Sequence, residues 1–279
     1  MNYRLRVMTA ADIPAGMRLK EIAGWNQTEG DWQRFLSASP EGCFAAEVEG
    51  RVVGTATTIT YENRFAWIGM VLVDPITRGQ GIGTRLLEKT IEYLDACGVP
   101  CMKLDATPQG KPIYEKLGFV SEYEIERWQL RRSPGKASVH SSAVELEDVL
   151  AFDREVFGAD RSGLLRSVTI QAPEFTLEVR IQGRLAGYAF GRRGSRADHL
   201  GPWVAQDEAS ARRLLDAFLQ CSRQELVFVD VMRPSPWAIP LLAEHGFEYV
   251  RPLTRMYRGR NDFPGRPGLQ GAILGPEFG

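Results

Sequence analysis

A glycine-rich loop between a strand-like segment and a helix-like segment places the strongest constraint on the fold of this chain. The apolar run Val71, Leu72 and Val73 precedes the loop Arg78-Gly79-Gln80-Gly81-Ile82-Gly83. From about residue 83 to 96, apolar side chains recur on one face of a helix, and a further strand-like run follows at 102–106. Strand, helix and strand in this order predict a βαβ unit with parallel strands.

The composition of the loop suits the binding of a phosphate group. Glycine leaves several backbone N–H groups accessible to an anion, and a helix N-terminus adds unpaired donors and a positive dipole. The segment lacks the G-K-[ST] ending of a P-loop, and no G-x-G-x-x-G with an acidic residue about twenty positions later supports a dinucleotide fold. Three glycines in five residues could also form a simple turn into the helix.

Apolar alternation and turn signals predict the other elements of the N-terminal half. The expected elements are a strand at 3–9, helices at 11–24 and 31–38, strands at 43–48, 51–61 and 66–73, a short helix at 113–117 and a strand at 119–130.

The C-terminal half repeats features of the N-terminal half. Gln182-Gly183-Arg184-Leu185-Ala186-Gly187 resembles Glu49-Gly50-Arg51-Val52-Val53-Gly54, and Glu244-His245-Gly246-Phe247 mirrors Lys116-Leu117-Gly118-Phe119. Two copies of one fold explain this similarity better than chance. We therefore predict a first domain at 1–131, a linker at 132–143, a second domain at 144–259 and a poorly ordered, glycine- and proline-rich tail at 260–279.

Composition and charge disfavour several classes of function. The 279 residues carry a formal net charge of -1, which supplies no global field for nucleic acid. No segment has the ~18 uninterrupted apolar residues of a membrane span, and no signal peptide is evident. Three histidines, and four cysteines without a CxxC pair, offer little for a metal site. We expect a cytoplasmic protein without metal, nucleic-acid partner or membrane partner.

The loop and a second motif together resemble a known family. Arg78-Gly79-Gln80-Gly81-Ile82-Gly83 matches the R/Q-x-x-G-x-G/A signature of the GNAT superfamily of N-acetyltransferases, and Ile113-Tyr114-Glu115-Lys116-Leu117-Gly118-Phe119 matches a downstream motif of that family. The resemblance covers residues 3–130 closely, and the remainder is similar to a divergent second copy. It implies an α/β (α+β) fold with a mixed sheet, in which two GNAT-like acyl-CoA N-acyltransferase domains stand in tandem.

The resemblance also implies the co-substrate and the residues that bind it. In this family the loop amides bind the CoA pyrophosphate, and the backbone of the preceding strand pairs with the pantetheine arm. Carried over, acetyl-CoA is the expected co-substrate. The implied binding residues are Val71, Leu72, Val73, Arg78, Gly79, Gln80, Gly81, Ile82, Gly83 and Thr84.

The same resemblance places Tyr114 near the acyl sulfur as general acid. A phenol with a reference pKa of ~10 is protonated at neutral pH and can donate to a departing thiolate. The alternative is a core aromatic residue. Asp105 and Glu62, each at a strand end, are candidate proton acceptors, although a structural or surface carboxylate explains either one more simply. Asp105 recurs as Asp230 in the second copy, which favours a structural role.

The second copy lacks the phosphate loop. When Trp67-Ile68-Gly69 is aligned with His199-Leu200-Gly201, the second copy is four residues shorter ahead of its helix. Its segment 204–210 has no glycine, and Asp207 and Glu208 would repel a pyrophosphate. Leu242 stands at the position of Tyr114. We therefore expect one CoA per chain, bound by the first domain.

The second copy is expected to contribute to acceptor selection instead. Candidates for a wall of the acceptor cleft are Trp203, Trp237, Arg233 and Tyr257, with core packing as the simpler alternative for each tryptophan.

Together these features predict an N-acetyltransferase that transfers an acetyl group from acetyl-CoA to a primary amine by direct attack, without a covalent enzyme intermediate. The acceptor is expected to be a small molecule or a short peptide, and the protein a monomer or a homodimer. A non-catalytic acyl-CoA-binding sensor or scaffold is the alternative, against which Tyr114 and the complete loop argue. The sequence leaves the acyl chain length open.

Overall fold

The computed structural model describes residues 2–133 and 144–279, which divide into two compact units. Unit 1 contains Met1–Ser121, Met256–Asp262 and Phe278, and unit 2 contains Glu122–Arg255, Phe263–Glu277 and Gly279. Apart from residues 132 and 133, the expected linker lies outside the described residues. The sequence-based boundaries at 131 and 144 follow the internal repeat and stay a prediction.

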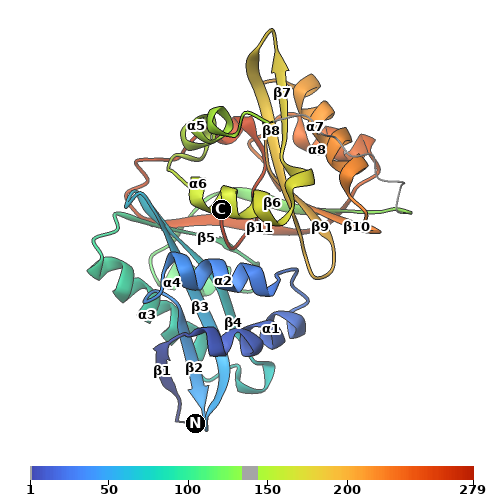
Figure 1. Ribbon diagram of the computed structural model, residues 1–279. Coiled ribbons are helices and arrows are strands. Elements are labelled where there is room, and N and C mark those ends of the chain that lie inside the picture. The colour runs from blue at the N-terminus through green and yellow to red at the C-terminus, as the bar shows by residue number, and fades with distance from the viewer. Residues whose placement is uncertain (1, 134–143) are drawn as a thin grey trace. The chain divides into compact units, whose positions relative to one another are not determined.

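Unit 1 is a mixed sheet flanked by helices (Figure 1). Strands β1 to β4 are antiparallel neighbours, β4 and β5 are parallel, and the end of β11 lies beside β5. Its elements are β1 (Arg4–Val7), η1 (Ala10–Asp12), α1 (Ile13–Ile22), α2 (Glu29–Ala38), β2 (Phe44–Val48), β3 (Arg51–Tyr61), β4 (Phe65–Val73), η2 (Pro75–Thr77), α3 (Ile82–Ala96), β5 (Cys101–Ala106) and α4 (Lys111–Lys116).

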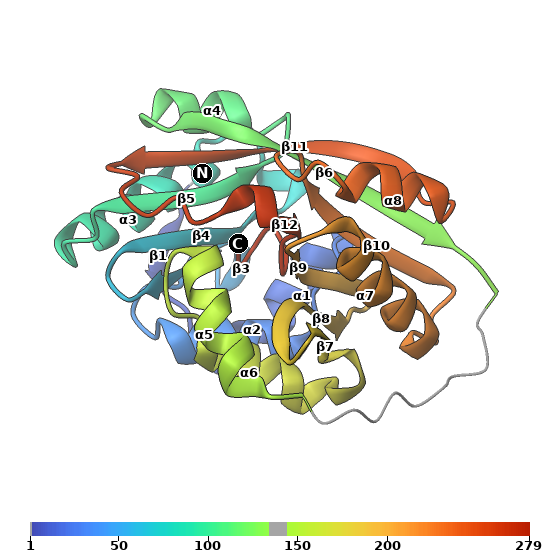
Figure 2. The same ribbon diagram turned by 90° about the horizontal axis from the view of Figure 1, so that it is seen from above.

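Helices cover both faces of the sheet in unit 1. Helix α3 buries its apolar stripe against β2 to β5, where Leu86 and Leu87 meet small and branched strand residues such as Ala46 and Ile68. Helices α1 and α2 lie on the opposite face in Figure 2, and the ring of Trp32 from α2 packs onto Gly16 of α1. A side chain at Gly16 would overlap that ring, because an added Cβ would lie 2.7 Å from it.

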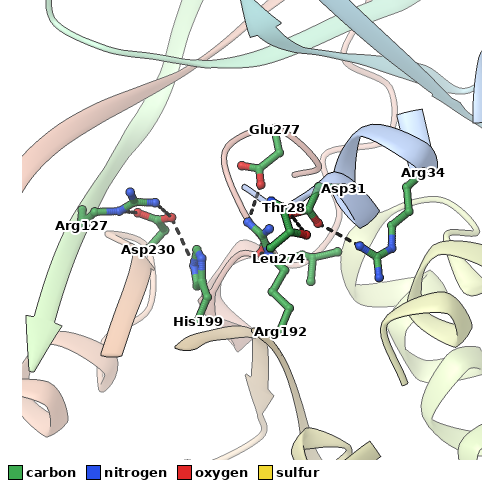
Figure 3. A network of polar contacts seen from close by, with 9 residues as sticks. All are labelled: Thr28, Asp31, Arg34, Arg127, Arg192, His199, Asp230, Leu274 and Glu277. Carbon is green, nitrogen blue, oxygen red and sulfur yellow. Dashed lines mark hydrogen bonds and ion pairs between the residues drawn. The ribbon is translucent and has the colours of Figure 1, made fainter. Parts of the chain in front are cut away.

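Helix α2 begins two residues before its predicted start. Thr28 and Asp31 form a capping box, in which the Thr28 backbone N–H donates to Asp31 Oδ2 at 2.8 Å. Arg34 Nη1 holds the other carboxylate oxygen at 2.9 Å (Figure 3). The T-x-x-D spacing is a known helix-start signal, and it sets the boundary more sharply than the apolar periodicity that placed the start at 31.

Unit 2 repeats the arrangement with its own set of parallel and antiparallel strands. The order of its strands is β11-β6-β10-β12-β9-β8-β7, and α7 buries Leu214, Leu215 and Phe218 in its core. Its elements are β6 (Val120–Arg131), α5 (Leu146–Phe157), α6 (Ser162–Gln171), η3 (Pro173–Phe175), β7 (Leu177–Ile181), β8 (Arg184–Arg193), β9 (Asp198–Ala205), α7 (Glu208–Cys221), β10 (Leu226–Met232), α8 (Ala238–Glu244), β11 (Glu248–Gly259), η4 (Pro267–Leu269) and β12 (Gln270–Ala272).

Two long strands are exchanged between the halves of the sequence. Strand β6, encoded in the first half, pairs antiparallel with β10 from Arg131↔Leu226 to Ile125↔Met232, and residues 122–131 belong to unit 2. The last residues of β11, encoded in the second half, belong to unit 1, where the Arg260 N–H donates to Pro100 O at 2.9 Å. Each unit therefore contains a strand segment from the other half of the sequence.

The prediction that residues 260–279 form a poorly ordered tail is wrong. Residues 270–272 form β12 within the sheet of unit 2, and Ile273 and Leu274 are fully buried there. Phe278 is equally buried in unit 1, where its ring stacks on Phe35 at 4.7 Å. The glycines and prolines that suggested a tail instead permit close backbone packing, and the few apolar residues between them are the buried ones.

A buried ion pair joins the neighbouring strands β6 and β10 of unit 2 (Figure 3). Arg127 of β6 binds both carboxylate oxygens of Asp230 of β10, at 2.8 and 2.6 Å, and His199 Nε2 lies 3.3 Å from the same carboxylate. Burial alone would raise the pKa of Asp230, but the interactions with Arg127 and His199 together outweigh burial and hold that pKa well below its usual range. Burial lowers the pKa of His199, which favours the neutral imidazole.

We predict that Asp230→Asn destabilises the protein by about 3–5 kcal/mol, because it leaves the Arg127 guanidinium buried without a counter-charge. Urea unfolding followed by fluorescence measures the change. The matched control is the double variant Arg127→Met/Asp230→Leu, which removes both charges and should lie much closer to the unsubstituted protein. A loss below about 1 kcal/mol for Asp230→Asn would contradict the assigned role of this pair.

Candidate functional site

A bulge in β4 opens the sheet of unit 1 next to the glycine loop. Met70 has a positive φ of 48°, and the register between β3 and β4 shifts between Thr55 and Thr57. Thr55 Oγ1 donates to the Met70 carbonyl at 2.8 Å, so the carbonyl that the bulge removes from the ladder is satisfied within the core.

The bulge separates β4 from its parallel neighbour. The two strands pair at Ala66↔Met102 and Trp67↔Lys103, ahead of the bulge. Beyond it, Leu72 and Val73 pair with β3 on one side, and no strand of the described chain pairs with their other edge. Arg78 Nε donates to the Val73 carbonyl at 3.1 Å. The other backbone groups of such an edge can pair with an extended ligand that carries amide groups.

A buried carboxylate fixes the turn between β4 and the loop. Asp74 accepts hydrogen bonds from Arg18 Nη1 at 2.6 Å, from Arg51 Nη2 at 3.2 Å and from the Ile76 backbone N–H at 3.3 Å. Burial alone would raise the pKa of Asp74, but the bonds from Arg18 and the Ile76 N–H, with the charges of Arg18 and Arg51, together outweigh burial and keep the pKa below its ordinary value. The turn is therefore held in one conformation before any ligand binds.

The glycine loop leads into α3 without side chains that would cover its amides. Gly79 and Gly81 have φ of 78° and 79°, a left-handed conformation that favours glycine, and a Cβ at either position would meet no atom within 4 Å. The Arg85 N–H donates to Gly81 O at 3.0 Å and closes the first helical turn. The N–H groups ahead of Arg85 have no intrahelical acceptor, as at any helix start. This end of α3 is suited to an anion.

Tyr114 lies on α4, and glycine clears space for its ring. An added Cβ at Gly110 would lie 2.9 Å from Tyr114 Cε2, and the ring meets Phe119 edge-on with centroids 6.0 Å apart. Within the described residues the hydroxyl makes no hydrogen bond to protein. Burial raises the pKa of Tyr114 to about 12, so the phenol holds its proton throughout the physiological range.

The two candidate proton acceptors occupy different environments. Asp105 is half-buried, one residue before the end of β5. Glu62 lies in the turn between β3 and β4, with a positive φ of 49° and an ion pair to Arg64 at 3.5 Å. Glu62 is thus at the end of β4 opposite the glycine loop.

The four wall candidates of the second copy differ in exposure. Trp203 and Trp237 are buried in the core of unit 2, edge to face at 4.8 Å, which agrees with the simpler alternative of core packing. Arg233 has an exposed side chain that pairs with Glu126 at 2.8 Å, and Tyr257 is half-buried.

Several residues that shape the site were not found from the sequence. The Asp-Pro turn signal could have identified Asp74, but its partners Arg18 and Arg51 come from distant segments. Nothing in the local sequence marks Met70 as a bulge, because the bulge depends on the register with β3.

A parallel strand pair split by a bulge, with a glycine-rich helix start beside the split, agrees with the acyl-CoA N-acyltransferase fold that the resemblance implied for unit 1. Comparisons with known families agree with this class. The Acetyltransferase (GNAT) family matches residues 16–119, and an Acetyltransferase (GNAT) domain matches residues 149–270. The chain belongs to the GNAT superfamily, as an acyl-CoA-dependent N-acetyltransferase with two GNAT domains in tandem.

Similar proteins match over most of the chain. Holothin acyltransferase of Pseudoalteromonas sp. (strain SANK 73390) is 27% identical over 85% of this chain and 81% of its own length. An uncharacterised N-acetyltransferase of Bacillus subtilis (strain 168), YitH, is 27% identical over 83% of both chains. A crystal structure of a proposed acetyltransferase from Pyrococcus horikoshii has a TM-score of 0.83 at 24% identity, and the match covers 99% of this chain and 96% of that one. The last likeness shows the fold alone.

Within the described residues, no helix is both long and apolar enough to cross a membrane.

We predict that Gly81→Leu weakens CoA binding about tenfold or more, a loss of about 1.4 kcal/mol, because a side chain there would cover the loop amides. Calorimetric titration measures the dissociation constant. Gly50→Leu is the matched control, since Gly50 has the same φ of 79° and open space at its Cβ but lies in the turn between β2 and β3. Both variants should lose a similar ~1–2 kcal/mol of stability. Equal CoA affinity in the two variants would show that the glycine loop does not bind CoA.

Proposed function

We propose that unit 1 transfers an acetyl group from acetyl-CoA to the primary amine of a small molecule by direct attack. The observation that carries this proposal is the open edge of β4 beyond Met70, which leads directly to the glycine-rich start of α3. Such an edge suits the amide groups of pantetheine, and the helix start suits the pyrophosphate. The binding residues proposed from the sequence, residues 71–73 and 78–84, lie along this one continuous path.

The proposed chemistry needs one proton donor and one proton acceptor. The neutral amine attacks the thioester carbonyl, a C–N bond forms and the C–S bond breaks. The departing thiolate takes a proton from Tyr114 Oη, and the amine loses one to water or to a carboxylate. A phenol with a pKa of about 12 remains protonated until the sulfur develops negative charge, which suits a general acid. Asp105 and Glu62 remain candidates for the acceptor.

A single compound as acceptor is supported by one relative. The holothin acyltransferase, which matches 85% of this chain, is named for one compound and not for a protein substrate. A cytoplasmic location is part of the proposal, because all four cysteines are free and disulfides are rare in reducing compartments.

We predict that Tyr114→Phe lowers kcat about 100-fold while the dissociation constant of acetyl-CoA changes less than about twofold. The substitution deletes the proton donor and keeps the ring that packs on Phe119. Because the pKa of Tyr114 is raised to about 12, its deprotonation should not lower kcat between pH 7 and about 10. Steady-state kinetics across this range measure both effects. An unchanged kcat at every pH would leave Tyr114 a packing residue.

The function itself is tested by thiol release from acetyl-CoA with a panel of primary amines, followed by mass spectrometry of the products. We expect at least one amine to gain an acetyl group at a rate that requires the complete glycine loop, with Gly81→Leu as the inactive control. Binding of CoA without thiol release for any amine would instead fit a non-catalytic sensor. Faster release from longer acyl-CoA donors would correct the acetyl assignment.

A further inference from the structure

Unit 2 contains the same split in its sheet as unit 1, at the same register. Strands β9 and β10 pair in parallel from Asp198↔Val227 to Leu200↔Val229, which corresponds to the pairing that begins at Ala66↔Met102 in unit 1. The β8–β9 register shifts between Ala189 and Gly191, within one residue of the equivalent shift between β3 and β4 in unit 1. Beyond this point β9 and β10 separate, as β4 and β5 do.

Strand β12 occupies the split of unit 2. Gln270 and Ala272 pair antiparallel with Val204 and Trp203 of β9, and Ala272 also pairs with Val231 of β10. Figure 2 shows this dark red strand beside β9 and β10. The Ile273 N–H then donates to Asp230 O at 3.1 Å.

The positions that β12 contacts correspond to the open edge in unit 1. By the register of the two sheets, Trp203 and Val204 of β9 stand where unit 1 has Val71 and Leu72. These are the residues proposed to pair with pantetheine in unit 1. The inserted strand therefore pairs with the same backbone groups that a pantetheine arm would use.

Glycines allow β12 to fit into the split. An added Cβ at Gly271 would lie 2.4 Å from the Trp237 ring and 2.9 Å from the Trp203 ring. An added Cβ at Gly201 of β9 would lie 1.8 Å from Ile273 O, a distance at which the two segments cannot coexist. The split between β9 and β10 is therefore narrow, and β12 already fills it.

The helix start of unit 2 is also occupied by a group of the chain. Asp207 caps α7, and its carboxylate accepts from the Ser210 N–H at 2.8 Å and from Ser210 Oγ at 3.1 Å. In unit 1 the corresponding cap of α3 is Gly81, which has no side chain. A carboxylate thus accepts from a backbone N–H at the helix end that corresponds to the proposed phosphate site of unit 1.

Buried arginines hold the segment after β12 in place within unit 2. Arg192 Nε donates to Leu274 O at 3.2 Å, and its Nη2 pairs with Glu277 (Figure 3). Arg161 Nη1 donates to Gly279 O at 2.9 Å while it binds Asp153 at 2.8 Å. Charge-assisted bonds at several points make this a firmly bound segment.

We infer that unit 2 carries its own replacement for acyl-CoA, with β12 in place of the pantetheine arm and the Asp207 carboxylate in place of the phosphate. Unit 2 is therefore closed to acyl-CoA because its site is filled from within, in addition to having lost its glycine loop. The comparison rests on the acyl-CoA path proposed for unit 1. Each chain therefore binds one acyl-CoA, in unit 1, and unit 2 is a domain of the same fold that does not bind acyl-CoA.

Hydrogen–deuterium exchange of the full chain with and without saturating CoA tests this inference. Peptides covering 68–84 should become protected by CoA, which reports on unit 1 alone. Peptides covering 199–205, 226–232 and 270–274 should exchange slowly and identically in both states. A CoA-dependent change in these three peptides, or two CoA molecules per chain by native mass spectrometry, would overturn the inference. If CoA leaves the exchange of the peptides covering 68–84 unchanged, that result would count against the proposed function instead.

A pair of glycine variants distinguishes the packing of β12 in the split from a general loss of stability. Gly201→Ala should raise exchange at 270–274 at least tenfold and lower the thermal midpoint, because the new methyl group overlaps Ile273 O. Gly183→Ala is the control, since Gly183 also has a positive φ, 78°, but open space at its Cβ. Unchanged exchange at 270–274 in Gly201→Ala would show that β12 does not occupy the split. If Gly201→Ala fails to fold, the exchange of the unsubstituted chain with and without CoA still tests the inference.

Discussion

The separation of two parallel strands after only a few paired residues is the constraint on which the rest of this structure depends. A strand that leaves its neighbour exposes a row of backbone donors and acceptors, and such groups are costly to bury unpaired. In unit 1 the Met70 carbonyl is satisfied by Thr55, while no strand of the described residues pairs with the other edge of Leu72 and Val73. In unit 2 the same edge is completed by β12. The chain itself completes this edge in unit 2, whereas we propose that a ligand completes it in unit 1.

Much of the local structure around the proposed site of unit 1 could be predicted from the sequence because its signals are local. The glycine loop, the apolar strand before it and the amphipathic helix after it are contiguous, and the structure places them along one path. The internal repeat was equally visible, and the strand registers of the two units agree with the alignment of Trp67 with His199. Local periodicity and spacing carry this information without knowledge of tertiary contacts.

The features that escaped prediction depend on distant partners. Residues 270–274 read as a tail because their few apolar residues show no periodicity, yet the split between β9 and β10 supplies every partner that β12 needs. The ion pair of Arg127 with Asp230 joins strands from different halves of the sequence. At Asp105 and Asp230 the repeat preserved the residue type, but its surroundings differ. Asp230 is fully buried against an arginine, whereas Asp105 is half-buried.

The exchange of strands between the halves has a consequence for the order in which the chain can fold during synthesis. Unit 1 includes residues 256–262, and the Arg260 N–H bonds to the Pro100 carbonyl across more than half the length of the chain. The first unit to leave the ribosome must therefore wait for its last strand segment until nearly all of the chain has been made. Contacts of such long sequence separation slow folding and prolong the time that a strand edge is exposed. A break in the chain between the two halves would therefore separate each unit from one of its own strand segments.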